Sequence, residues 1–372
     1  MALQQQLLRL LKLHQSRLLQ PSAACARGHV SRPSSSTSND NLDCSPLLEN
    51  LSILGVDLKS AWQRQPGVLR KAQTNEHGLA EFLSHKGASR DVIASIISRY
   101  PRAITRSGKH LEERWKLWHS ILQDDSEIIR ILDRSPESFF RSSDNEDLEK
   151  NIVFLTSLGV MPRDLMKLLS TAPRVFSNSL ELNRAMVELL KSVCESLGGR
   201  DHEAFARAIL FKNAYVLIRS TKRVSANIQF LLTYFMLSNA EALNLLQSHG
   251  AKILDLSHTS LERNIKNLQA KLKTLGCSSS ETKKLVLKHS VVLFVSAERL
   301  NKKLDCLVEG GIDVKHIVGR PNVLDFSIVT LKQRLSKLNT IGYDFEANGI
   351  GILDMSKKRF QQKLMKLQVN EK

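Results

Sequence analysis

The stretch VIASIISRYPRAITRS, residues 92–107, contains the pattern that decides the fold. Its apolar side chains are spaced for one face of a helix that ends at Pro101. Proline ends the helix because it disfavours helical geometry in the preceding residue and has no N–H to donate. The Ala-Ile pair after Pro101 predicts a single turn that plugs the core. Ser107 predicts the N-cap of the next helix, because its hydroxyl can accept a hydrogen bond from a free backbone N–H.

The same pattern recurs along the chain at intervals of 29 to 41 residues. We call the residue that starts each short turn the anchor. The third residue after the anchor is apolar nine times out of nine, and the sixth is serine eight times. Helical units of this kind cannot bury their faces alone and must stack. The sequence therefore predicts an all-α, right- or left-handed superhelical solenoid of about nine helix–helix–short-turn repeats, with anchors at Pro66, Pro101, Pro136, Pro173, Ala214, Ala251, Ser290, Pro321 and Ile350.

Charge is the most informative feature of the composition. The 372 residues include 54 Lys and Arg against 37 Asp and Glu, a formal net charge of +17, which favours a polyanionic partner. Every apolar run is broken by charged residues well before the length that a membrane span needs, so we expect no membrane insertion. The five cysteines form no CxxC pair, and the histidines do not cluster with acids at ligand spacing.

Motifs for catalysis or for phosphate loops are not found in the sequence. Its densest polar cluster, residues 198–203, is interpreted as a loop between two helices that includes the start of the second helix. We therefore expect no enzyme activity, no catalytic residues, no metal and no cofactor.

The N-terminal segment differs from the rest of the chain. Residues 1–39 contain five Lys or Arg, no acid and a leucine-rich start, the composition of a mitochondrial transit peptide. The alternative is a disordered basic arm that assists nucleic-acid binding. We predict a disordered transit peptide over 1–39, a linker over 40–46 and a DNA-binding solenoid over 47–372, and hence a location in the mitochondrial matrix and nucleoid.

Basic residues recur at three positions of the repeat. A cation two residues before the anchor has two equal interpretations. It contacts a ligand, or it has only a structural role, because the dipole of a helix favours positive charge at the C-terminus whatever the function. Nine residues after the anchor, the same dipole opposes the cation, which favours contact with phosphates or bases. The cations two residues before the anchor are Arg64, Arg99, Arg134, Lys212 and Lys288. Those five residues after it are Lys71, Arg106, Arg141 and Arg219, and those nine residues after it are Arg223, Arg299 and Arg359.

Tyr215 stands out among the few aromatic residues because it directly follows an anchor, where other repeats carry Arg102, Glu137, Arg174 or Lys252. Two readings remain open: a stacking platform for an unpaired base, or a tyrosine that is merely exposed. Trp118 and Phe139 occupy apolar repeat positions and are predicted to lie in the core.

Several strings resemble the mitochondrial transcription termination factor family, and the resemblance covers residues 47–367. The most specific are RQPGV at 64–68, RSPESFFRS at 134–142, STKRV at 220–224 and SKKR at 356–359. The resemblance implies a monomer that binds double-stranded mitochondrial DNA and terminates transcription downstream of the ribosomal RNA genes, inside a leucine tRNA gene. It also implies that the protein bends and unwinds the duplex and flips bases out.

The resemblance assigns roles to particular residues. It implies base-reading by Arg141, Arg174, Arg223 and Arg359, and base-stacking by Arg134 and Tyr215. The chain departs from the family pattern at Ser260, where a further stacking tyrosine is usual, and at Asn322, where a further guanine-reading arginine is usual. We expect contacts to the phosphate backbone from Arg99, Arg102, Arg106, Arg219, Lys222, Arg299, Lys357 and Lys358.

Three alternative functions follow from the same sequence. One is a ribosomal RNA partner in mitochondrial ribosome assembly, as in other members of the family. Another is a protein-binding scaffold, a common use of helical solenoids. The third and weakest is a helix-rich enzyme.

Overall fold

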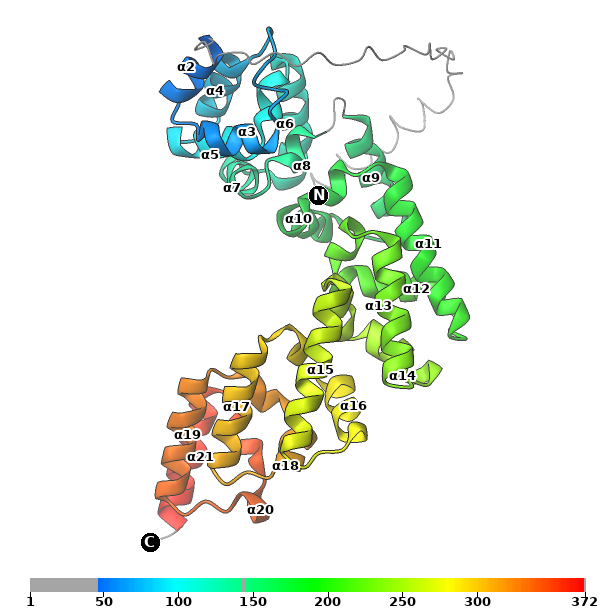
Figure 1. The fold of residues 1–372 in the computed structure, drawn as a ribbon, viewed down its shortest axis with the longest axis vertical. Coiled ribbons are helices and arrows are strands. Elements are labelled where there is room, and N and C mark those ends of the chain that lie inside the picture. The colour runs from blue at the N-terminus through cyan, green and yellow to red at the C-terminus, as the bar shows by residue number, and fades with distance from the viewer. Residues whose placement is uncertain (1–45, 142–144, 371–372) are drawn as a thin grey trace, which may run out of the picture. The chain divides into compact units, whose positions relative to one another are not determined.

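The computed structural model describes residues 46–141 and 145–370. Within these ranges every regular element is an α-helix or a short 3-10 turn, so the predicted all-α class is confirmed (Figure 1). The predicted transit peptide over 1–39 and residues 40–45 of the linker lie outside the described residues. The first described helix begins at Pro46.

The described chain folds into nine helix–helix–turn repeats, as predicted. The first helices of the repeats are α2 (Pro46–Ile53), α4 (Glu76–His85), α6 (Gly108–Leu122), α9 (Glu146–Ser157), α11 (Leu180–Ser196), α13 (Thr221–Tyr234), α15 (His258–Thr274), α17 (Ala297–Glu309) and α19 (Ile328–Thr340). The second helices are α3 (Leu58–Arg64), α5 (Arg90–Arg99), α7 (Asp125–Arg134), α10 (Pro162–Thr171), α12 (His202–Lys212), α14 (Asn239–Gln247), α16 (Ser279–Lys288), α18 (Val314–Gly319) and α20 (Phe345–Asn348).

Short turns close the repeats, and a last helix, α21 (Lys357–Asn370), follows the ninth. The turn of the first repeat is irregular, at residues 66–70. The third repeat closes with a four-residue α-helix instead of a 3-10 turn, and η4 begins two residues before its predicted anchor, Ala251. The regular closing turns are η1 (Pro101–Thr105), α8 (Glu137–Phe140), η2 (Pro173–Ser177), η3 (Ala214–Ile218), η4 (His249–Asp255), η5 (Ser290–Phe294), η6 (Pro321–Asp325) and η7 (Ile350–Asp354).

The closing turns plug the core, as the apolar pattern predicts. All nine residues at the third position after the anchor are buried, from Leu69 to Leu353. Trp118 and Phe139 are fully buried and pack edge to face, with ring centroids 5.2 Å apart. Each turn thus seals the space between its two helices.

Serine N-caps begin many of the first helices. The hydroxyls of Ser107, Ser220, Ser257 and Ser327 accept hydrogen bonds from backbone N–H groups of the first turn. The Ser356 hydroxyl accepts likewise from the N–H of Arg359. At Ser296 the residue is in the N-cap position but its side chain makes no capping bond, so this instance of the prediction is only half right.

In five of the described repeats a polar side chain on the first helix donates a hydrogen bond to the closing turn, a feature that the sequence analysis did not predict. Thirteen residues after the preceding anchor, Arg114 donates to the carbonyl of Phe139 at 3.0 Å, and Arg334 donates to that of Leu353 at 2.6 Å. Asn264 and Lys303 make the equivalent bond in their repeats, to Leu293 and Leu324, and Asn227 bonds the carbonyl of Leu256, two residues further along its turn. These donors satisfy carbonyl groups that a short turn cannot satisfy itself.

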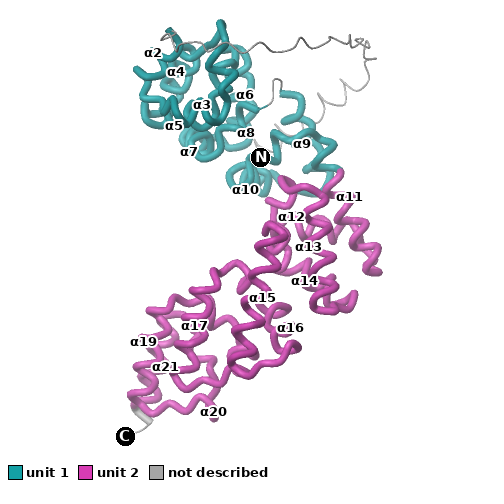
Figure 2. Tube along the Cα trace, viewed as in Figure 1, with its two compact units in different colours: residues 1–184 teal, residues 185–372 magenta. Residues whose placement is uncertain are grey.

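The chain divides into two compact units, residues 1–184 and 185–372, with the boundary inside α11 (Figure 2). In each unit, like elements of successive repeats pack together: first helices such as α15 and α17, second helices such as α5 and α7, and turns such as η6 and η7. The first residues of successive turns therefore follow one another along one side of a unit.

Candidate nucleic-acid interface

Within each unit, the first residues after the anchors form a row that we call the turn row: Gly67, Arg102, Glu137 and Arg174 in the first unit, and Tyr215, Lys252, Val291, Asn322 and Gly351 in the second. Six of its members are exposed and three are half-buried, whereas the next residue of every turn is buried. The prediction that this position faces solvent is confirmed. Tyr215 is 41% exposed, which makes its ring accessible to a ligand.

In the first unit, three predicted arginines gather around Tyr100. Burial raises the pKa of the Tyr100 phenol, and the positive charges of Arg106, Arg102 and Arg141 oppose that rise. The tyrosine ring stacks on Phe140, with centroids 6.5 Å apart. Positive charges from two successive repeats therefore act on one partly buried aromatic side chain. The sequence analysis missed Tyr100, although its place directly before an anchor was visible.

Arg106 positions this cluster. Its Nε and Nη2 donate to the carbonyl of Phe140 at 2.9 and 2.6 Å, and Nη2 also reaches the carbonyl of Arg141 at 3.1 Å. Burial lowers the pKa of this guanidinium. Its hydrogen bonds join two neighbouring turns, so its main contribution here is to hold Arg141 in place.

Arg141, Arg102 and Arg174 present accessible charge in the first unit. Arg141 and Arg102 are exposed, and neither side chain makes a hydrogen bond to the described residues. Arg174 is 44% exposed, and its Nε lies 3.7 Å from a carboxylate oxygen of Glu137, a loose ion pair that a phosphate can replace. Glu137 also raises the pKa of Tyr100, which places it at the same cluster.

Arg99 and Arg134, two residues before their anchors, differ from Arg102 and Arg141 because their side chains donate hydrogen bonds within the protein. Arg99 donates to the carbonyls of Asp133 and Arg134 at the end of α7, and Arg134 donates to that of Ser170 at the end of α10. In the second unit Lys288 repeats the contact with Gly319. Each cation caps the second helix of the following repeat, so the helix-end interpretation holds for these three, through a neighbouring helix. Both arginines remain exposed.

In the second unit, Arg219 and Arg223 surround Asp255. Arg219 Nε lies 3.4 Å from the carboxylate, and Arg223 donates to the carbonyls of Leu256, at 2.9 Å, and of Asp255. Burial raises the pKa of Asp255, while a hydrogen bond from Asn213 and the charge of Arg219 oppose that rise.

This arrangement corrects our argument for Arg223. We interpreted a cation at this position as a contact to phosphates or bases because the helix dipole opposes it, but two carbonyl groups of the closing turn offset the dipole. Burial lowers the pKa of its guanidinium. To read a base, Arg223 has to exchange these carbonyl bonds for contacts with the base.

The remaining predicted cations stand at the starts of α13, α17 and α21. They are exposed, and none of their side chains makes a hydrogen bond or ion pair with the described residues. Free backbone N–H groups at a helix start also favour phosphate. The five residues are Lys222, Arg299, Lys357, Lys358 and Arg359.

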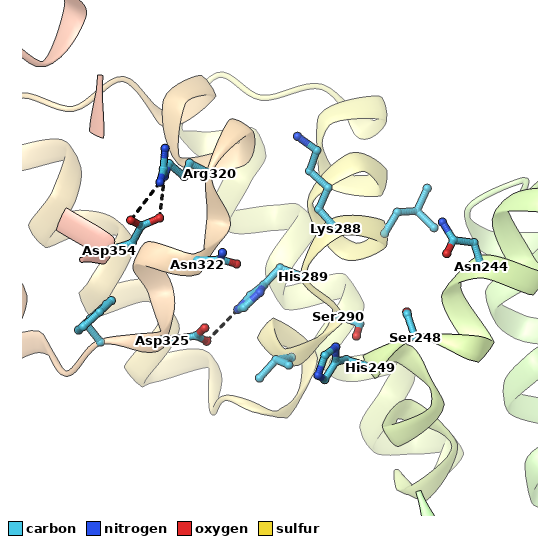
Figure 3. Close-up of a pocket in the computed structure, with 13 residues that line it drawn as sticks. Asn244, Ser248, His249, Lys288, His289, Ser290, Arg320, Asn322, Asp325 and Asp354 are labelled. Carbon is cyan, nitrogen blue, oxygen red and sulfur yellow. Dashed lines mark hydrogen bonds and ion pairs between the residues drawn. The ribbon is translucent and has the colours of Figure 1, made fainter. Parts of the chain in front are cut away.

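Ser260 and Asn322 occupy different surroundings. Ser260 is the repeat equivalent of Arg223, and its hydroxyl accepts a hydrogen bond from that of Ser257 at 2.7 Å. Asn322 lines a pocket of about 690 Å³ in the second unit, formed by residues of α14, α16 and the turns η4 to η7 (Figure 3). The ion pair Arg320–Asp354 and a hydrogen bond of 2.9 Å between His289 Nε2 and Asp325 belong to its wall.

The structure thus brings Arg102, Arg106 and Arg141 together in one unit, with Arg174 joined to them through Glu137. Arg223 and Arg359 belong to the other unit. Among the described residues, no group of three His, Cys, Asp or Glu side chains could hold a metal ion. No described helix is long and apolar enough to cross a membrane.

The sequence that forms these helical repeats and anchored turns matches a family model. The mTERF family pattern covers residues 47–361, and the chain belongs to the mTERF family. It is 49% identical over 331 residues to human "Transcription termination factor 1, mitochondrial", which covers 89% of this chain and 83% of the human protein.

Further relatives extend the comparison. Mouse "Transcription termination factor 1b, mitochondrial" is 49% identical over 321 residues, 86% of this chain and 85% of the mouse protein. Rat "Transcription termination factor 2, mitochondrial" is 28% identical over 348 residues, 91% of this chain and 89% of the rat protein. The names of these relatives confirm the predicted mitochondrial location; matrix and nucleoid stay predictions.

Proposed function

We propose that this protein binds double-stranded mitochondrial DNA at a specific site downstream of the ribosomal RNA genes and terminates transcription there. The observation that carries the proposal is the set of exposed arginines on successive turns of the first unit, Arg102, Arg141 and Arg174, where Arg106 donates hydrogen bonds to the carbonyls of Phe140 and Arg141. Transcription termination is also the activity in the names of its relatives. The protein acts as a monomer in the nucleoid and not as an enzyme.

Affinity comes mainly from the phosphates. The exposed cations at the helix starts and Arg102 neutralise backbone charge, and the counterions that they release make binding fall steeply with salt. Arg99 and Arg134 keep the repeats in register, and Arg99 reaches phosphates from the edge of the same row.

Specificity comes from fewer residues. Arg141, Arg174 and Arg359 are exposed, and a guanidinium can bond both acceptors of a guanine edge. Arg223 joins them when it leaves the carbonyls of η4. Arg134 and Tyr215 stack on bases that leave the helix, so that the bent and unwound duplex holds the protein against an oncoming polymerase.

A binding competition tests this function. The full chain is titrated onto tiled duplex fragments of mitochondrial DNA and onto structured RNA of the same sequences. One duplex fragment should bind most tightly, and its affinity should fall by about 10³-fold between roughly 50 and 200 mM salt if at least six phosphates are contacted. Tighter binding of ribosomal RNA would favour a role in ribosome assembly, and salt-insensitive binding of a protein would favour a scaffold.

A further inference from the structure

Arg320 is an exposed arginine of the second unit that lies outside the predicted set of DNA contacts. It stands directly before the anchor Pro321 and lines the pocket beside the turn row (Figure 3). Its side chain is 54% exposed, whereas that of its partner Asp354 is 11% exposed. The carboxylate is therefore largely covered, and the guanidinium is the accessible part of the pair.

Two features of the next closing turn, η7, fix the orientation of this guanidinium. The first is a pair of hydrogen bonds, in which Nε and Nη2 donate to the two carboxylate oxygens of Asp354, at 2.6 and 3.2 Å. The second is Gly351, where a Cβ atom would lie 2.7 Å from Nη1 and 2.9 Å from Cζ of Arg320, so that an alanine would displace the arginine. Gly351 does not have a left-handed φ that would require glycine, so space for Arg320 explains its lack of a side chain.

The carboxylate of Asp354 does not cancel the positive charge at this place. Burial lowers the pKa of the Arg334 guanidinium, and the negative charge of Asp354 opposes that fall. One carboxylate thus serves two arginines, and the three side chains together keep one positive charge. Lys288 adds another cation, because its Nζ donates to the carbonyl of Gly319, directly before Arg320, at 3.2 Å.

A phosphate is the ligand that this arrangement suits. A guanidinium that is oriented in advance loses less conformational entropy on binding than a freely rotating one does. Nη1 of Arg320 makes no hydrogen bond to the described residues, so its N–H groups remain for a ligand. Asp325, the other acid of the pocket wall, bonds His289 at 2.9 Å and not Arg320. Since the pocket opens beside the turn row, the phosphate belongs to the DNA.

We infer that Arg320 contacts a backbone phosphate of the bound duplex, and that Asp354 and Gly351 are positioning residues that hold its guanidinium for this contact. The inference rests on the proposed function and extends it to residues that the sequence analysis did not assign. It gives Asp354 an effect that charge alone does not predict. Loss of this carboxylate should weaken DNA binding, although it removes a negative charge from a protein that binds a polyanion.

Duplexes with one uncharged phosphate test the contact. The tightest-binding duplex fragment is prepared as a series in which one phosphate at a time is replaced by a methylphosphonate, and the full chain is titrated onto each. In the wild type, each contacted phosphate should show a loss of affinity of about tenfold. In Arg320→Gln, one of these phosphates should become insensitive while the others keep their losses, and the salt dependence should fall by about one contact.

Asp354→Asn and Gly351→Ala test the positioning, because both variants keep Arg320. Each should weaken binding of the unmodified duplex and reduce the loss at the phosphate that Arg320→Gln identifies. Asp305→Asn is the matched control: Asp305 pairs with Lys271 in the same unit and does not line the pocket, so this variant removes the same charge but should keep the wild-type profile of losses. Thermal unfolding checks that each variant is folded.

The outcomes separate this inference from the proposed function. If Arg320→Gln keeps every loss of the wild type, Arg320 contacts no phosphate and the inference is overturned, while duplex binding stands. If Asp354→Asn tightens binding and keeps the wild-type profile, as charge alone predicts, the inference is overturned as well, because the carboxylate does not position Arg320. If the wild type binds no duplex, the proposed function fails and this contact fails with it.

Discussion

Arg99 donates a hydrogen bond of 2.7 Å to the carbonyl of Arg134, which lies 35 residues further along the chain. Arg134 in turn donates to Ser170, so two successive repeats use the same contact. The cation that ends one helix therefore caps the corresponding helix of the next repeat. This capping fixes the register in which the turn row presents its arginines.

Arg99→Ala should lower the free energy of unfolding by about 1 to 2 kcal/mol, because two carbonyl groups at the end of α7 lose their charged donor. Arg102→Ala removes a neighbouring exposed arginine whose side chain bonds no described residue, and it should change stability by less than about 0.5 kcal/mol. Urea denaturation of the two variants makes the comparison. Equal stabilities would show that the repeat-to-repeat cap contributes nothing measurable.

Arg334→Met should destabilise the second unit by about 2 to 4 kcal/mol. The buried guanidinium donates to the carbonyl of Leu353 and lies 4.5 and 4.8 Å from the ring centroids of Phe326 and Phe360. Methionine keeps most of the apolar bulk but leaves the carbonyl without its donor. Thermal unfolding followed by circular dichroism measures the loss. Lys332→Met, an exposed position two residues away, provides the comparison and should be nearly neutral.

Much of this fold could be predicted because its signals are local. A proline, an apolar residue three positions on and a serine six positions on each affect only a few neighbouring backbone groups. Ser257 and Ser296 show the limit: both serines occupy the N-cap position, yet only Ser257 makes the side-chain bond, a difference that spacing does not encode.

The site was harder to predict than the fold. Arg223 and Arg299 occupy the same place in their repeats, but Arg223 binds the carbonyls of its closing turn and Arg299 is exposed without a described partner. Likewise, the partners of Arg99 and Arg106 belong to the next repeat, so they depend on how the repeats stack. A count of cations along the sequence cannot separate those that hold the protein together from those that face a ligand.

Asp255→Asn should stabilise the protein at neutral pH. Burial raises the pKa of Asp255 above its ordinary value of 3.8, so the folded state favours the neutral acid. The stabilising contribution of such a group is present below 3.8 and is lost as pH rises through the folded pKa. The advantage of the asparagine variant should therefore be largest near pH 7 and shrink towards pH 3.8. Urea unfolding at a series of pH values measures it, and a stability difference that stays constant with pH would contradict the assignment.

Arg141→Ala should relax base preference while leaving the fold intact. The side chain is exposed and bonds no described residue, so its loss removes no internal contact, whereas Arg106 holds the same turn through the carbonyls of Phe140 and Arg141. A guanidinium that reads guanine contributes about 1 to 3 kcal/mol against a wrong base. Binding to the best duplex fragment should therefore weaken by about that amount, with little change for unrelated duplexes.

Arg106→Ala separates positioning from reading at this cluster. It should lower the free energy of unfolding, because the carbonyl groups of the next turn lose their donor. It should also reduce the preference for particular bases, because Arg141 is no longer held in place. Selection of bound sequences from a random duplex pool, carried out for wild type and both variants, measures the preference directly. If Arg141→Ala instead weakens binding equally for every sequence and reduces the salt dependence by one contact, then Arg141 binds a phosphate and the bases are read elsewhere.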